Sequence, residues 1–154
     1  MKQLLKNPLT NALGLSIFST FYGLIFILTS GHREFIDILY YAQRGKGSSF
    51  LESWSAFLAN GYQAYIAYAL IAISVVVVLM LLLRRRPYDE YHTQVLTHCL
   101  AVATILTLAA IAIFYLGILS DPNGIIEKFT LFITIHWSTV VLADLVYVIV
   151  CRWR

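Results

Sequence analysis

Charged residues are scarce in this chain of 154 residues. Only 12% are Asp, Glu, Lys or Arg, whereas 60% are hydrophobic and the mean hydropathy is +0.77. Soluble domains carry about 25% charged residues, so this composition cannot cover a water-facing surface and argues against a soluble globular fold. It also excludes an intrinsically disordered chain, because disorder requires low hydrophobicity and high net charge.

Cysteine is equally scarce, since the sequence contains only Cys99 and Cys151. Two residues cannot form the framework of a small secreted module that several disulfides hold together. Both cysteines come close to span ends that we expect on the reducing, cytoplasmic side, where a disulfide between them is not expected. The remaining class is an integral membrane protein.

The sequence contains several long apolar runs with few or no charged residues. A helix that crosses a bilayer needs about 20 apolar residues at about 1.5 Å each, and no run alternates as the strands of a membrane barrel do. Turn formers and a triple-arginine segment before a proline separate the runs. We predict an all-α, integral membrane four-helix bundle, a single transmembrane domain over residues 1–154, with spans at about 12–30, 62–83, 95–119 and 129–150.

The distribution of Lys and Arg predicts the orientation of these spans. The first run has 19 residues, which is longer than the apolar region of about 7–15 residues in a signal peptide, so we expect it to be retained. Seven Lys and Arg residues lie on the side of the two termini and four on the other side. Because positive charge favours the cytoplasm, we predict a multi-pass cell-membrane protein with both termini cytoplasmic.

The loop 31–61 would then lie outside the cytoplasm. Apolar residues recur at helical spacing over 35–44, which is typical of a short amphipathic helix in the membrane interface. Ser49 and Glu52 fit a capping box at the start of a second short helix. The pattern allows this helix to continue through Gly61 into the second span.

Small residues along the spans indicate where helices pack together. Helices in lipid associate through small and polar residues. Such residues recur in the first span at Gly14, Ser16, Ser19, Thr20 and Gly23, with the pairs Ser16/Thr20 and Ser19/Gly23 four residues apart, and in the third span at Ala103, Thr107 and Ala110. Four short helices have little interior of their own, so we also expect a homo-oligomer or a membrane-protein partner within the lipid bilayer. Nothing in the sequence indicates a nucleic-acid partner.

Three ionisable residues fall within the predicted spans. Such residues are costly in lipid and mark functional sites or interior pairs. Asp144 and His98 lie about 9 Å and about 5 Å inside the same boundary, so they can pair across antiparallel spans, and His136 lies near the midplane. A competing interpretation of His136 is an imidazole that only bonds a neighbouring helix. The predicted ligand- or proton-binding site comprises His136, Asp144, His98, Thr134 and Ser138.

These residues lead to a first hypothesis of a non-enzymatic membrane component that binds or transports a small solute or serves as a subunit of an assembly. A second hypothesis is a membrane enzyme that acts on a lipid or isoprenoid headgroup at the outer face, where polar residues gather. No known catalytic motif supports an enzyme. The residues of this alternative outer-face site are His32, Arg33, Glu34 and Asp37.

A third hypothesis is a haem-binding electron carrier. Haem with two histidine ligands needs both on facing helices at one depth, and the four histidines do not supply such a pair in the predicted topology. The spacing of His92, His98 and Cys99 is a weak match to known metal sites. We therefore predict neither haem nor a metal cofactor.

Overall fold

The computed structural model describes residues 7–30, 32, 35, 49–83, 88–120, 122 and 124–152. Within these residues every regular element is a helix, and four helices are long and apolar enough to cross a membrane, as predicted. The elements are α2 (Pro8–Thr29), α4 (Ser49–Ala59), α5 (Gln63–Leu82), α6 (Glu90–Ser120) and α7 (Ile125–Arg152).

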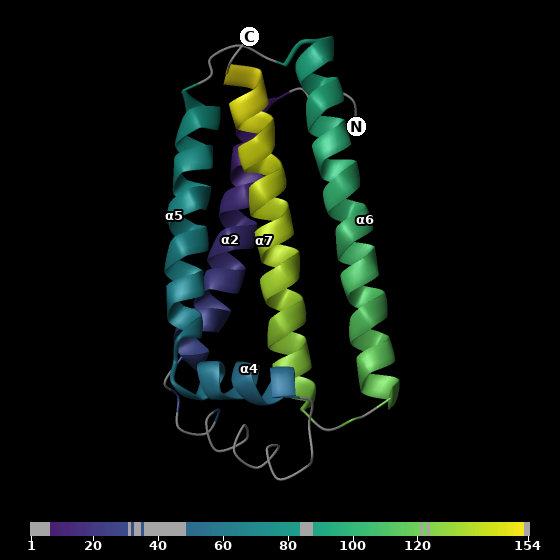
Figure 1. Cartoon of the computed structure of the whole chain (residues 1–154). Coiled ribbons are helices and arrows are strands. Elements are labelled where there is room, and N and C mark those ends of the chain that lie inside the picture. Colours follow the sequence, from purple (N-terminus) through teal and green to yellow (C-terminus); the bar gives the residue numbers. More distant parts are fainter. Residues whose placement is uncertain are drawn as a thin grey trace.

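The four long helices run side by side, and the short helix α4 lies across one end of the bundle (Figure 1). α2 begins and α7 ends at the opposite end, which is called the terminal end below. α2 packs against α5 and α7, α5 packs against α7, and α4 also contacts α7. α6 packs against α7 and stands on the side of α7 that is away from α5.

The first helix begins earlier than the predicted span, because polar residues cap it. Asn7 is the N-cap, and its side chain accepts a hydrogen bond of 3.0 Å from the backbone N–H of Leu9. Pro8 follows at the first helical position, where its missing N–H costs nothing. Asn11, which lay just outside the predicted span, thereby becomes part of the membrane helix.

A turn at Gly61 separates α4 from α5, so α4 does not continue as a helix through this glycine into the second span. Gly61 has φ of 72°, a left-handed conformation that glycine adopts without steric cost. Its carbonyl accepts a hydrogen bond of 2.8 Å from the Ser30 hydroxyl, which ties this turn to the end of α2. The amphipathic helix predicted over 35–44 lies outside the described residues, apart from Phe35.

The buried side chains of α5 recur at intervals of three and four residues, and those of α6 recur at intervals of seven residues. This spacing is typical of helices that pack with a slight left-handed twist. The buried residues of α5 are Gln63, Ala67, Leu70, Ser74, Val77 and Leu81. Those of α6 are Leu96, Ala103 and Ala110.

The predicted seam at Ser19 and Gly23 is confirmed as the contact between α2 and α5. A Cβ atom added at Gly23 would lie 2.8 Å from Cδ1 and 3.2 Å from Cγ1 of Ile71, so the glycine leaves room for the Ile71 side chain against α2. Trp137 of α7 is 0% exposed and fills the space beside this contact. The centre of the bundle is therefore tightly packed between α2, α5 and α7.

Candidate functional site

Buried polar side chains lie on α2, α5 and α7. They are described here as the interior polar row, and each is at most 8% exposed. By contrast, the buried residues of α6 are all apolar. The members of the interior polar row are Ser19, Gln63, Ser74, Glu127, Thr130 and Asp144.

Asp144 lies at the terminal end of the row and is 2% exposed. It precedes the last residue of α7 by eight positions, which places it about 12 Å along the helix from that end. Its Oδ1 accepts a hydrogen bond of 3.1 Å from Nδ2 of Asn11 in the first turns of α2. The carboxyl group therefore has a neutral amide as its bonding partner within the described part of the chain.

The middle of the row is a chain of hydrogen bonds that joins all three helices. Nε1 of Trp137 donates to the Ser19 hydroxyl at 3.3 Å, and the Ser19 and Ser74 hydroxyl oxygens are 2.8 Å apart. The Ser74 hydroxyl donates to the Leu70 carbonyl at 2.8 Å, so Ser19 donates to Ser74. Each donor in this chain has an acceptor, as a buried polar network requires.

His136 is partly buried beside α2, away from Asp144. Its Nδ1 lies 3.1 Å from the Tyr22 hydroxyl oxygen. The rings of Phe18 and Phe132 pack against the imidazole, with centroid separations of 5.2 Å and 5.8 Å. This arrangement anchors the imidazole between α2 and α7. It is the type of bond that the competing interpretation of His136 expects, in which the imidazole only bonds a neighbouring helix.

The other three predicted site residues do not join Asp144 and His136 in one cluster. His98 is exposed on α6, and its Nδ1–H donates to the Gln94 carbonyl of the same helix at 2.8 Å. The Thr134 hydroxyl donates to the Thr130 carbonyl of its own helix at 2.8 Å. Ser138 is partly buried on α7. The structure thus gives His98 and Asp144 different partners.

A polar cluster at the α4 end was not foreseen from the sequence. Glu127 is 3% exposed, and its Oε1 accepts a hydrogen bond of 3.1 Å from the Ser55 hydroxyl. Nε1 of Trp54 donates to the Glu127 carbonyl at 3.1 Å and to the Thr130 hydroxyl at 3.2 Å. These bonds fasten α4 to α7. The only sequence signal was a glutamate in the first turn of an apolar helix.

Of the four residues in the alternative outer-face site, the structure describes only His32. His32 is exposed, and its backbone N–H donates to the Thr29 carbonyl at 3.4 Å. Arg33, Glu34 and Asp37 lie outside the described residues.

Comparisons with protein-family models, with curated proteins and with solved structures give no match for this chain.

Proposed function

We propose that this chain is a small non-enzymatic membrane component that binds or passes a small cation, with the proton as the simplest case, at Asp144. One observation carries the proposal: a carboxyl group 2% exposed within a membrane helix accepts its hydrogen bond from the neutral amide of Asn11. An ionised carboxylate at this depth is costly unless a positive charge accompanies it. The group therefore holds a proton or takes up a cation.

The position of Asp144 favours access from the terminal end of the bundle. Trp137, at the centre of the next polar contact, is seven residues away along α7, which is about 10 Å of helix rise. Hydrogen bonds do not reach across this distance. Asp144 and Asn11 are therefore the binding site itself, and the hydroxyl chain at Ser19 serves to hold the three helices.

Proton flux into vesicles tests the role of Asp144. The full chain is reconstituted with a pH-sensitive dye inside the vesicles, and a membrane potential is imposed. We expect dye acidification above that of empty vesicles, lost in Asp144→Asn. Glu52→Gln is the matched control, because it removes the same charge from an exposed position on α4 and should keep the flux.

Binding without transport is tested by infrared difference spectroscopy on the same protein. A carboxyl band that changes with pH or with added Na⁺, and that disappears in Asp144→Asn, is the expected result. If Asp144→Asn changes neither the flux nor this band, the proposal fails.

We also propose an orientation of the chain in the membrane. The excess of Lys and Arg on the side of the termini supports two cytoplasmic termini and an α4 that lies outside. With both native cysteines replaced, Glu52→Cys should react with a membrane-impermeant maleimide in intact cells. Reaction only after cell lysis would reverse the orientation.

Assembly into a homo-oligomer or with a membrane partner also remains a proposal. Its support is the large apolar surface of α6, on which Ile105, Ile113 and Leu116 are 65%, 70% and 66% exposed. Native mass spectrometry of the full chain in detergent measures the oligomeric state directly. A strictly monomeric species over a range of protein concentrations would rule out the homo-oligomer.

A further inference from the structure

Two buried oxygen atoms at the α4 end of the bundle have no hydrogen-bond partner within the described part of the chain. They are Oε2 of Glu127 on α7 and Oε1 of Gln63 on α5. The two side chains are 3% and 1% exposed. Buried acceptors without a partner are rare in folded proteins, and each one requires an explanation, such as a bound ion.

The contacts of Gln63 determine which end of its amide lacks a partner. Its Nε2 lies 3.0 Å from the Thr29 hydroxyl oxygen and 3.5 Å from the Phe26 carbonyl oxygen. The Thr29 hydroxyl donates its own proton to the Ile25 carbonyl at 2.6 Å, so it accepts a hydrogen bond from Gln63. Both neighbours therefore require the NH₂ group of the amide. The amide oxygen is the atom that remains without a partner.

Glu127 and Gln63 lie at the same level of the bundle. Helices α5 and α7 both run from the α4 end to the terminal end (Figure 1), and they pack against each other. Gln63 precedes Ser74 by eleven residues, which is about 17 Å of helix rise. Glu127 precedes Trp137 by ten residues, which is about 15 Å. Since Ser74 and Trp137 both contact the Ser19 hydroxyl, Glu127 and Gln63 belong to one layer of the interior.

Helix α4 lies across this end of the bundle (Figure 1). Its Ser55 hydroxyl donates a hydrogen bond of 3.1 Å to Oε1 of Glu127, and its Leu58 side chain is 0% exposed. A Cβ atom added at Gly124 would lie 3.3 Å from Oε2 of Glu127. The carboxyl group is therefore enclosed between α4 and the turn that precedes α7.

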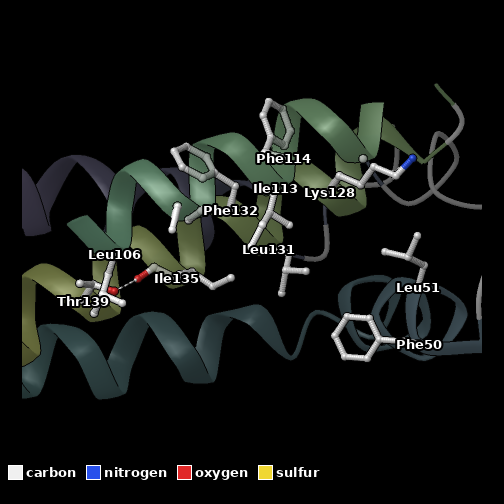
Figure 2. Close-up of a pocket in the computed structure, with 13 residues that line it drawn as sticks. Phe50, Leu51, Leu106, Ile113, Phe114, Lys128, Leu131, Phe132, Ile135 and Thr139 are labelled. Carbon is white, nitrogen blue, oxygen red and sulfur yellow. Dashed lines mark hydrogen bonds between the residues drawn. The ribbon is translucent and has the colours of Figure 1, made fainter. Parts of the chain in front are cut away.

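No positively charged side chain forms an ion pair with Glu127 among the described residues. Lys128 is the next residue in the sequence, but its stem lies against Gly117 of α6. Two cavities, of about 550 Å³ and about 390 Å³, lie along the contact between α6 and α7, and Figure 2 shows Lys128 among the residues that line the larger one. The hydrogen bond of the Glu127 side chain is instead to Ser55 of α4.

The chemistry of this layer favours a monovalent metal cation. Carboxylate and amide oxygens are ligands of hard cations. One carboxylate balances one positive charge, whereas a divalent ion would leave a net charge in a buried site. A water molecule donates hydrogen bonds but supplies no charge. A proton would neutralise Glu127, but the side chain lies in the first turn of α7, where the helix dipole favours the ionised carboxylate.

We propose that Glu127 and Gln63 bind a monovalent metal cation beneath α4. Oε2 of Glu127 supplies the negative charge, and Oε1 of Gln63 supplies a neutral oxygen. Glu127 precedes Asp144 by seventeen residues on α7, which is about 26 Å along the helix. The two carboxyl groups therefore lie near opposite ends of the bundle, and binding at Glu127 does not depend on the function proposed for Asp144.

Equilibrium binding of radiolabelled Na⁺, Rb⁺ and Ca²⁺ to the purified full chain in detergent tests the site. The Asp144→Asn protein is the background, because it removes the other candidate cation site. We expect it to retain one Na⁺ or Rb⁺ ion per chain in the presence of choline and to retain no Ca²⁺. Retention of neither monovalent ion, or retention of Ca²⁺ in their place, would overturn the proposal.

Substitutions of the two ligands locate the ion in the same background. Glu127→Gln keeps an acceptor for Ser55 but removes the charge, so it should lower the affinity for Na⁺ at least about tenfold. Gln63→Leu removes a neutral contact and should lower this affinity about threefold to tenfold. Glu52→Gln is the matched control, because it removes the same charge from an exposed position on α4.

Thermal unfolding separates loss of binding from loss of folding. Because a bound ion stabilises the folded state, exchange of choline for Na⁺ should raise the unfolding temperature of Asp144→Asn and leave that of the protein with Glu127→Gln added unchanged. A Glu127→Gln protein that binds Na⁺ as tightly as the Glu52→Gln protein would contradict the assignment, and unchanged binding in Gln63→Leu would contradict the role of Gln63. Unchanged proton flux in Asp144→Asn would instead reject only the function proposed for Asp144.

Discussion

The interior between α2, α5 and α7 and the contact between α6 and α7 are built from different side chains. The interior holds the polar row, with hydrogen bonds such as that of Asn11 to Asp144. The two cavities between α6 and α7 are lined almost entirely by apolar residues, and the residues that α6 buries are leucine and alanine. Three helices meet at the Ser19 and Ser74 hydroxyls, whereas only two helices form the contact between α6 and α7. The contrast indicates that this bundle places its polar side chains where more than two helices meet and exclude lipid.

Of the substitutions in the interior, Trp137→Ala should cause the largest loss of free energy of unfolding. The side chain is 0% exposed and donates a hydrogen bond to Ser19. We expect Trp137→Ala to lower the free energy of unfolding by about 3 kcal/mol, because it leaves a cavity among three helices. Thermal unfolding in detergent measures this loss, and Phe21→Ala, at a ring that is 60% exposed, is the control. Equal losses for the two variants would contradict a tightly packed interior.

A larger side chain at Gly23, in the contact between α2 and α5, should cause the next largest loss of free energy of unfolding. A side chain at Gly23 meets Ile71 at once, whereas Gly14 has nothing within 4 Å of an added Cβ atom. Gly23→Leu should therefore cost about 1–3 kcal/mol through overpacking. Gly14→Leu should be close to neutral in the same unfolding measurement. A neutral Gly23→Leu would mean that the two helices are farther apart than described.

Loss of the amide partner of Asp144 should have a smaller effect. Asn11→Leu leaves the buried carboxyl without its hydrogen bond, which should cost about 1–2 kcal/mol. In the Asp144→Leu background the same substitution should be nearly neutral, because no buried polar group is left unpaired. Stability measurements on the four proteins of this double-mutant cycle check the prediction. Strict additivity would show that the two residues do not interact.

The bond between Ser19 and Ser74 should give the smallest effect. Hydrogen bonds between membrane helices have an average coupling energy of about 0.6 kcal/mol. A cycle of Ser19→Ala and Ser74→Ala, measured by unfolding in detergent, should give a coupling of this size. The same cycle with Ser19→Ala and Thr104→Ala is the control, because the Thr104 hydroxyl donates to the Leu100 carbonyl of its own helix, α6.

The membrane-spanning helices could be predicted from the sequence, because length and lack of charge determine them. The spans predicted at 12–30 and 129–150 correspond to Pro8–Thr29 and Ile125–Arg152. The faces of the helices could not be predicted equally well. Residues that face lipid are as apolar as residues of the core, so hydrophobic periodicity carries little information about rotation.

Because the rotation of each helix could not be predicted, parts of the candidate site were missed. The depths of His98 and Asp144 were compatible with a pair, but the rotation of α6 leaves His98 exposed and the early start of α2 provides Asn11 instead. The cluster at Glu127 depends on where α4 packs, which no pattern within α4 determines. By contrast, the contact at Gly23 was among the predicted small-residue seams, whereas Gly14 in the same span has nothing within 4 Å of an added Cβ atom.

The contrast between the two regions is tested most directly by the oxygen accessibility of nitroxide labels along α7 in a bilayer. Ile133, Val141 and Val148 are at most 7% exposed, whereas Leu142, Val146 and Ile149 are 48%, 50% and 45% exposed. We predict low collision rates with oxygen at the first three positions and high rates at the other three. Equal rates at all six positions, or the reverse order, would contradict an interior that α2, α5 and α7 close against lipid.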